Sequence, residues 1–427
     1  MAQLKPAFGQ GAFRMVGTKI GLEIHAELAT ESKLFCSCAT SASEPNSAVC
    51  PTCCGFPGAK PVLNRKAVDF AVMVALGLNC RVNREFFFSR KSYFYPDLAK
   101  NFQTTQYEIP VGENGFIDVG GKKVRIRRVH LEEDPAALVH ESGRGPSSYC
   151  LVDYNRSGVP LVEIVTEPDM GSPAEARALM DRLLVLLNYL GVHAHGKGVL
   201  KADCNISIEG GERVEVKNVT GFRAIEDALE AELARQQKLV ASGEKVVLET
   251  RGFDADTKST YSMRSKETED DYGYITDTDL VKTEIDDAWL AALKARVPEL
   301  SQAKALRFMQ EYGLREYDAK VLSAGRRIAG IFEDAAKIDV QVAVRMVGRE
   351  LLGVLNYNTL KIEDTKIDAK GISGLVLLIK EGKVSDKNAK ESLIRYALEG
   401  VPPKEFLEKN KLLIDTHSSD VGAVAKG

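Results

Sequence analysis

Carboxylate and imidazole side chains stand close together near the start of the chain, in the segment Gly21–Leu28. As a strand, this segment places Glu23 and His25 on one face and apolar residues on the other, because side chains alternate along a strand. A carboxylate beside an imidazole can bind a divalent cation or transfer a proton. The alternative is a surface strand with ordinary polar residues, and this segment alone leaves both open.

Further acidic residues occur where mutual repulsion or burial makes them costly. Glu132, Glu133 and Asp134 are consecutive, so they repel one another unless solvent or a cation neutralises them. A solvated turn is the alternative there. Glu163 lies inside the apolar run 161–165, where glutamate is rare unless it is paired or bound to a metal. With the first strand, these acids form an oxygen-rich set with one imidazole, which suits Mg²⁺ or Mn²⁺ better than zinc.

Polar residues also alternate along two strands that we predict as a hairpin, residues 201–207 and 213–218. Asp203 and Asn205 share one face of the first strand, and Lys217 lies on the second. An exposed hairpin and a pair of polar faces directed into one pocket are both consistent with this pattern.

Four of the eight cysteines fall within residues 36–53. They form two close pairs, Cys36 with Cys38 and Cys50 with Cys53, on a loop rich in Ser, Pro and Gly. Two such pairs can converge on Zn²⁺ as thiolates in a closed, structural site, and we favour zinc over free thiols.

The usual phosphate-binding loops are absent from the sequence. It contains neither a G-x-x-x-x-G-K-[ST] loop nor a G-x-G-x-x-G turn between strand and helix, and no serine nucleophile elbow. Phosphate chemistry would therefore depend on metal-bound carboxylates and dispersed Arg and Lys side chains. The residues favour metal-assisted phosphoryl transfer or acid–base chemistry.

Helices must position these strands. We predict helices over residues 64–79 and 222–241, and a third that begins at Ser172 and ends near Leu190. Serine before proline suits a helix start, because serine can cap the first turn and proline needs no N–H there. After Pro298, strand patterns stop and helical patterns continue.

These patterns predict an α+β fold, a mixed sheet followed by helical segments. The predicted bounds are 1–295 for the first domain, with the cysteine loop 36–53, then 296–366 and 367–427.

Composition is that of an ordinary globular protein, with 44% hydrophobic and 27% charged residues. A net charge of −3 argues against indiscriminate nucleic-acid binding but leaves room for a local basic patch. We find no secretory signal and no apolar run near the roughly 20 residues of a membrane span. The clustered cysteines indicate a reducing compartment, and we expect a cytoplasmic protein without membrane attachment.

The order of several motifs resembles the B subunit (GatB) of the tRNA-dependent amidotransferases, the aspartyl/glutamyl-tRNA(Asn/Gln) or GatCAB family. The resemblance covers nearly the whole chain, and the segment 134–140, D-P-A-A-L-V-H, resembles the archaeal-type branch. The motifs are G-L-E-I-H (21–25), C-S-C (36–38), V-C-P-T-C (49–53), Y-F-Y-P-D-L (93–98), H-L-E-E-D (130–134), V-D-Y-N-R-S-G-V-P-L-V-E-I-V-T-E-P-D (152–169) and E-V-K-N (215–218).

The resemblance implies a glutamine-hydrolysing, ATP-dependent ligase. It also implies the division of the fold into a large mixed-sheet catalytic domain, an all-α helical domain and a partial helical tail domain. The chain would use ATP and Mg²⁺ to phosphorylate the side-chain carboxylate of Glu mischarged on tRNA(Gln), Asp mischarged on tRNA(Asn), or both. Ammonia from the amidase (glutaminase) subunit would then displace phosphate and give the amide. The implied partners are this amidase, known as GatA, the small subunit GatC and the charged tRNA, which the helical part would bind. A non-catalytic, zinc-containing tRNA-binding scaffold subunit is the alternative.

The resemblance also assigns residues. The Mg²⁺-site positions would be Glu23, His25, Glu132, Glu133 and Glu163, and the zinc positions would be Cys36, Cys38, Cys50 and Cys53. The polar positions around the pocket would be Arg156, Asp203, Asn205 and Lys217, of which Arg156, Asn205 and Lys217 would bind ATP. The catalytic residues would be Glu23, His25, Glu133, Glu163, Asp203 and Lys217.

Overall fold

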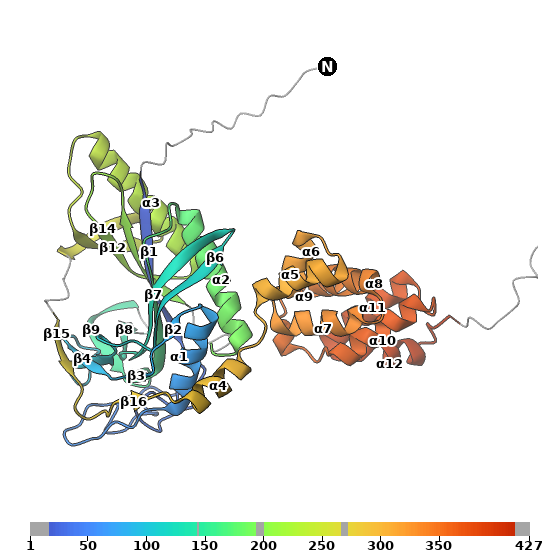
Figure 1. The fold of residues 1–427 in the computed structure, drawn as a ribbon, viewed down its shortest axis with the longest axis horizontal. Coiled ribbons are helices and arrows are strands. Elements are labelled where there is room, and N and C mark those ends of the chain that lie inside the picture. The colour runs from blue at the N-terminus through green and yellow to red at the C-terminus, as the bar shows by residue number, and fades with distance from the viewer. Residues whose placement is uncertain (1–16, 143–144, 194–199, 266–271, 415–427) are drawn as a thin grey trace, which may run out of the picture. The chain divides into compact units, whose positions relative to one another are not determined.

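The chain folds into two compact units, Met1–Val297 and Pro298–Gly427, in a computed structural model (Figure 1). The structure describes residues 17–142, 145–193, 200–265 and 272–414. Within these residues, the first unit combines strands and helices, and the second is helical. This confirms the predicted mixed fold with a helical C-terminal region.

A large mixed sheet forms the centre of the first unit. Among the described residues it has nine strands, and all neighbouring pairs are antiparallel except β12 and β13. The first strand of the chain, β1, therefore lies inside the sheet with partners on both sides. From edge to edge the order is β14 (Ser259–Ser265), β13 (Glu249–Asp254), β12 (Val214–Thr220), β11 (Lys201–Ser207), β1 (Lys19–Glu27), β10 (Pro160–Thr166), β7 (Lys122–Glu133), β6 (Gly112–Val119) and β2 (Arg81–Val82).

Three helices pack side by side on one face of this sheet: α1 (Arg65–Gly77), α2 (Pro173–Leu190) and α3 (Phe222–Ala241). The apolar residues of β1 face them, and Ile20 and Ile24 are completely buried. Burial of this apolar face leaves the alternate side chains of β1 for the opposite face of the sheet.

The helix bounds agree with the predicted ones to within two residues, because the sequence carries explicit capping signals. Ser172 caps α2, with its Oγ accepting a hydrogen bond from the Glu175 backbone N–H at 3.2 Å. At the other end, Gly191 adopts a φ of 66°, a left-handed conformation that glycine tolerates best.

Smaller elements surround the main sheet. A three-stranded sheet pairs β15 with β4 and β4 with β5, and two-stranded ribbons pair β16 with β3 and β8 with β9. A fourth helix, α4, closes the first unit. Their bounds are β3 (Glu85–Phe86), β4 (Ser89–Ser92), β5 (Phe102–Thr105), β8 (Ala137–Ser142), β9 (Gly145–Asp153), β15 (Gly273–Thr276), β16 (Thr283–Glu284) and α4 (Asp287–Arg296).

One hydrophobic core runs through the second unit, from Ala305 to Leu407. It includes residues on both sides of the predicted boundary at 366/367, and the division into helical and tail domains stays a prediction. The helical elements are α5 (Ser301–Tyr312), α6 (Glu316–Ser323), α7 (Arg326–Ala336), α8 (Val340–Arg345), a π-helical segment (Met346–Leu351), α9 (Leu352–Tyr357), a 3₁₀ turn (Ile362–Asp364), α10 (Ala369–Lys380), α11 (Asp386–Glu399) and α12 (Pro403–Lys409).

No helix among the described residues is both long enough and apolar enough to cross a membrane.

Candidate functional site

The face opposite the helices carries the polar residues of β1. Strand pairing sets Glu23 opposite Asp203 of β11, and it sets His25 opposite Glu163 of β10. Directly opposed residues on neighbouring strands project to the same face of a sheet. Glu23 and His25 therefore each meet an acid from a different neighbouring strand.

The first cluster, which we call the His25 group, consists of His25, His130, Glu132 and Glu163. His25 Nε2 lies 3.1 Å from Glu132 Oε1 and 3.5 Å from Glu163 Oε2. His130 Nε2 lies 3.1 Å from Glu163 Oε2 and 3.8 Å from Glu132 Oε2. Each of the two carboxylates is thus shared between two imidazoles.

Charge pairing within the His25 group outweighs the effect of burial. Burial acts to lower the pKa of His25, but hydrogen bonds and charge from Glu132 and Glu163 hold it well above its usual value. Burial and the charge of Glu163 act to raise the pKa of Glu132, yet hydrogen bonds from His130 and His25 lower it to about 2. Both acids of the group are therefore strongly held as carboxylates.

The second cluster, the Glu23 group, consists of Glu23, Asp203, Asn205, Glu215 and Lys217. The amide Nδ2 of Asn205 donates to Glu23 Oε1 at 3.0 Å. The ammonium of Lys217 lies 2.8 Å from Asp203 Oδ2 and 2.9 Å from Glu215 Oε1. Three carboxylates therefore share one ammonium within this group.

The carboxylates of the Glu23 group respond differently to this shortage of positive charge. Burial, followed by the charges of Glu163, Glu215 and Asp203, raises the pKa of Glu23. Burial also opposes the charged form of Asp203, but the nearby Lys217 charge lowers its pKa overall. A cation added to this group would relieve the repulsion on Glu23.

Glu133 and Arg156 take other partners in the structure. Glu133 Oε1 accepts a hydrogen bond from the Thr104 backbone N–H at 2.9 Å and pairs with the ammonium of Lys100. Arg156 donates to the backbone carbonyls of residues 135–136, at 2.9 and 2.7 Å. Their assignment to Mg²⁺ and ATP stays a prediction.

Three residues of this region were not assigned to the site by the resemblance: His130, Glu215 and Lys100. His130 lies two residues before Glu132, and Glu215 lies two before Lys217, so each shares a strand face with a candidate. The period of two was a sufficient signal for both. Lys100 lies in a loop, where no such periodicity applies.

Both groups have donors suited to a divalent cation. In each, three donor atoms lie within 4.8 Å of one another, one each from His25, Glu132 and Glu163, or from Glu23, Asp203 and Glu215. Carboxylates with at most one imidazole suit Mg²⁺ or Mn²⁺. The donor sets therefore fit the predicted metal, divided between two places on the face.

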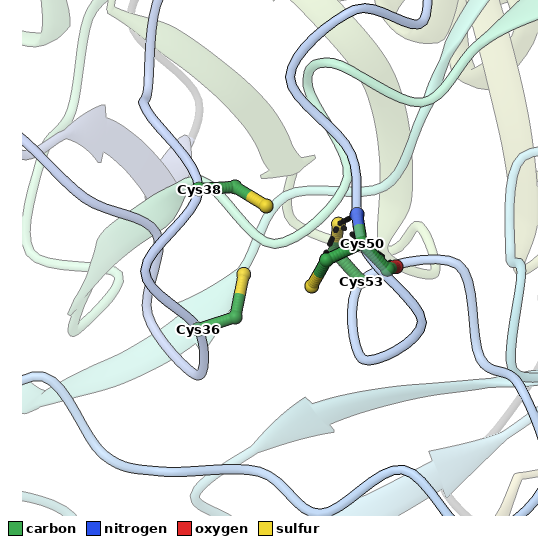
Figure 2. Close-up of side chains that lie close together, drawn as sticks. All are labelled: Cys36, Cys38, Cys50 and Cys53. Carbon is green, nitrogen blue, oxygen red and sulfur yellow. Dashed lines mark hydrogen bonds between the residues drawn. The ribbon is translucent and has the colours of Figure 1, made fainter.

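The four predicted cysteines come together at one place, between the two loops that carry them. Their four sulfur atoms all lie within 4.8 Å of one another. Figure 2 shows Cys36 and Cys38 directing their sulfurs toward the turn that carries Cys50 and Cys53. The Cys50 backbone N–H donates to Cys53 Sγ at 3.2 Å. Four thiols in such an arrangement suit tetrahedral Zn²⁺.

Cys53 is the most acidic of the perturbed thiols in this cluster. A hydrogen bond from Cys36, with further help from the Cys50 backbone N–H and the charge of Lys33, lowers the pKa of Cys53 to about 4. The pKa of its partner Cys36 is raised by the same hydrogen bond and by burial. At least one sulfur is thereby prepared as a thiolate, the form that binds metals.

Comparison with protein families matches two regions of the chain. Residues 18–291 match the family described as the GatB/GatE catalytic domain, and residues 331–425 match the GatB domain. The chain belongs to the GatB family of amidotransferase subunits. This confirms the family that the motifs indicated and makes the chain one component of a ligase complex.

Curated GatB proteins agree over almost the full chain. The B subunit of the aspartyl/glutamyl-tRNA(Asn/Gln) amidotransferase from Thermotoga maritima is 46% identical, covering 92% of this chain and 85% of that protein. The Sulfolobus acidocaldarius protein of the same name is 44% identical, covering 92% and 86%. That of Brevibacillus brevis is 42% identical, covering 95% and 87%. Bacterial and archaeal relatives are similarly close, and the archaeal-type branch stays a prediction.

Proposed function

We propose that this chain activates the side-chain carboxylate of an aminoacyl-tRNA by transferring to it the γ-phosphoryl group of ATP. The substrate would be Glu on tRNA(Gln), Asp on tRNA(Asn), or both. Ammonia released from glutamine by a separate amidase would attack the acyl phosphate, giving the amide and inorganic phosphate. Phosphorylation is needed because a free carboxylate oxygen is a poor leaving group.

The observation that carries the proposal is the pair of acidic groups on one face of the sheet, in a chain of this family. A GatB chain that only held RNA would gain nothing from partly buried carboxylates that repel one another. Such clusters are common at functional sites that bind cations and phosphates. The scaffold alternative is therefore not favoured.

The chain's own residues organise the reacting groups before any substrate arrives. His25 and His130 hold Glu132 and Glu163 by hydrogen bonds, and this fixes where their oxygens point. Mg²⁺ bound at these carboxylates would neutralise charge on the phosphates as the phosphoryl group moves.

Lys217 adds a second source of positive charge. It lies between Asp203 and Glu215, where its ammonium can turn from carboxylate to phosphate when a nucleotide binds. Arg156 and Asn205 complete the set that we assign to ATP. Because Asn205 donates to Glu23, it holds that carboxylate in place.

Zinc, the partner proteins and the compartment complete the proposal. Zn²⁺ bound by Cys36, Cys38, Cys50 and Cys53 would be structural, because all four positions of a tetrahedron would be occupied by protein. The amidase GatA and the small protein GatC would assemble with this chain, whose helical unit would bind the tRNA. A cysteine cluster that binds metal rather than forming disulfides favours the reducing cytoplasm.

Reconstitution with the partner proteins tests the proposal. ATP hydrolysis and amide formation are measured with mischarged tRNA and with ammonium chloride instead of glutamine, which removes any dependence on the amidase. We expect Glu163→Gln to lower both rates at least about a hundredfold, or about 3 kcal/mol of transition-state stabilisation.

The matched control is Glu167→Gln. This residue follows the same strand but pairs with Arg127 away from both groups, and its variant should keep the wild-type rates. Equal rates for wild type and Glu163→Gln, with ammonium supplied, would refute the site. An ATP hydrolysis rate that is the same with and without mischarged tRNA would refute the assignment of the substrate.

A further inference from the structure

Lys33 is a completely buried lysine in the loop between β1 and the first cysteine pair. Its Nζ lies 3.1 Å from the backbone carbonyl of Tyr154 and 3.5 Å from Cys53 Sγ. Removing an ammonium from water costs several kcal/mol unless an opposite charge and hydrogen bonds compensate. No carboxylate of the described residues forms an ion pair with it, so the compensating charge must be sought among the sulfurs.

The thiolates of a cysteine-bound metal centre supply that charge. Four thiolates around one divalent cation carry an excess of negative charge, which a buried cation can offset. A hydrogen bond from an ammonium to a coordinating sulfur also fixes the direction of that ligand. We propose that Lys33 is the positioning residue of the cysteine metal centre, donating to the Cys53 thiolate and offsetting the charge of the metal–sulfur cluster.

The same lysine joins the metal loop to the turn before β10. Two further hydrogen bonds connect the two segments: the Leu34 backbone N–H donates to Gly158 O, and Ser157 Oγ donates to Cys53 O. Their lengths are 2.8–2.9 Å. The turn leads directly into the strand that carries Glu163. Metal binding is thereby linked to the position of that strand.

A direct role in the phosphoryl-transfer reaction does not fit Lys33. Its side chain has no exposed surface, so a substrate carboxylate or phosphate cannot reach its nitrogen. The inference concerns a metal that we assign under the proposed function, and it is tested by measurements that need no enzymatic activity.

The first experiment compares Lys33→Met with wild type in the full chain, purified with its partner proteins. Methionine keeps the length of the side chain and removes the charge and the donors. We expect zinc to transfer to a chromogenic chelator about 10- to 100-fold faster, as for loss of other outer-shell partners of metal ligands. With Co²⁺ in place of zinc, the thiolate charge-transfer absorption should shift. Lys33→Arg, which keeps charge and donors, should restore both readings in part.

Lys60→Met is the matched control. Lys60 follows the same cysteine loop, but its side chain is exposed and pairs with Asp279, so its variant should release zinc at the wild-type rate. A folded Lys33→Met chain with wild-type zinc release and an unshifted cobalt spectrum would overturn the proposal.

Wild-type protein gives a second test if Lys33→Met does not fold. Lysine acetylation, read by peptide mass spectrometry, should spare Lys33 while zinc is bound and modify it after a chelator removes the metal. Protection of Lys33 that is the same with and without metal would overturn the proposal. A chain that purifies without zinc would also overturn the proposal about Lys33, but it would not affect the proposed ATP-dependent reaction. Normal zinc behaviour with no ATP turnover would refute only the proposed function.

Discussion

Glu23 and His25 lie two residues apart on the same face of β1, yet their side chains belong to different acidic groups. Glu23 accepts a hydrogen bond from Asn205 of β11, and His25 contacts Glu163 of β10. The two donor sets therefore lie on either side of β1, one toward β11 and one toward β10. Two cations held this way could contact different parts of a nucleotide and its acceptor.

The division predicts two separable metal sites. We expect Mn²⁺ titration, followed by electron paramagnetic resonance, to show two bound ions per chain in the presence of an ATP analogue. Glu163→Gln should abolish one and Asp203→Asn the other, because each removes a donor from one group only. Glu167→Gln should keep both. Loss of both ions in either single variant would mean that the groups form one site.

The cysteine cluster predicts different roles for two neighbouring thiols. Cys53→Ser should lose zinc and lower the unfolding free energy of the first unit by at least about 2 kcal/mol, because metal binding energy contributes to folding. Cys54→Ser should retain zinc, since Cys54 is outside the four-sulfur group. Zinc analysis and thermal melts check both. Equal zinc content in the two variants would contradict the ligand assignment.

Thiol reactivity should depend on pH in a defined direction. Burial raises the pKa of Cys80 to about 12, and only the thiolate reacts with iodoacetamide. At pH 8 we expect the exposed Cys150 to be alkylated while Cys80 stays unmodified in folded protein. The native rate at Cys80 should rise as pH approaches 12, and urea should remove the protection. Equal labelling of both residues at pH 8 would contradict the burial.

Arg327 stabilises the segment between α9 and α10. Its guanidinium donates to the backbone carbonyls of Ile362, Thr365 and Ile367 at 2.6–3.1 Å. Arg327→Met leaves these carbonyls without their donor, which should cost about 2–4 kcal/mol in urea denaturation. Lys337→Met, at an exposed position of the same unit, should change little. Rapid proteolysis near residue 365 would be a second sign of the loss.

Much of the first unit could be predicted from local patterns. The alternation in β1, the Ser172 cap of α2 and the hairpin of β11 and β12 are encoded by neighbours in sequence, and the structure has all three. The convergence of the four cysteines was also predictable, because two close pairs in one short segment favour a shared metal site.

The division of the acids between two groups could not be predicted in this way. It depends on strand register, which sets His25 against Glu163 and Glu23 against Asp203 across more than a hundred residues of chain. Adjacent residues on a strand point to opposite faces, so composition cannot say which of Glu132 and Glu133 joins His25. The structure directs Glu132 to His25 and Glu133 to Lys100.

The interior position of β1 has a consequence for synthesis on the ribosome. Its partners in the sheet, β10 and β11, and Lys217 beyond them are translated much later. About 190 residues separate Glu23 from Lys217, and at about 5–20 residues per second this takes about 10–40 s. The last residue of the His25 group, Glu163, is translated before Lys217, the last residue of the Glu23 group, so the two groups are completed one after the other. The proposed ATP-dependent reaction therefore requires that β10 and β11 have first paired with β1.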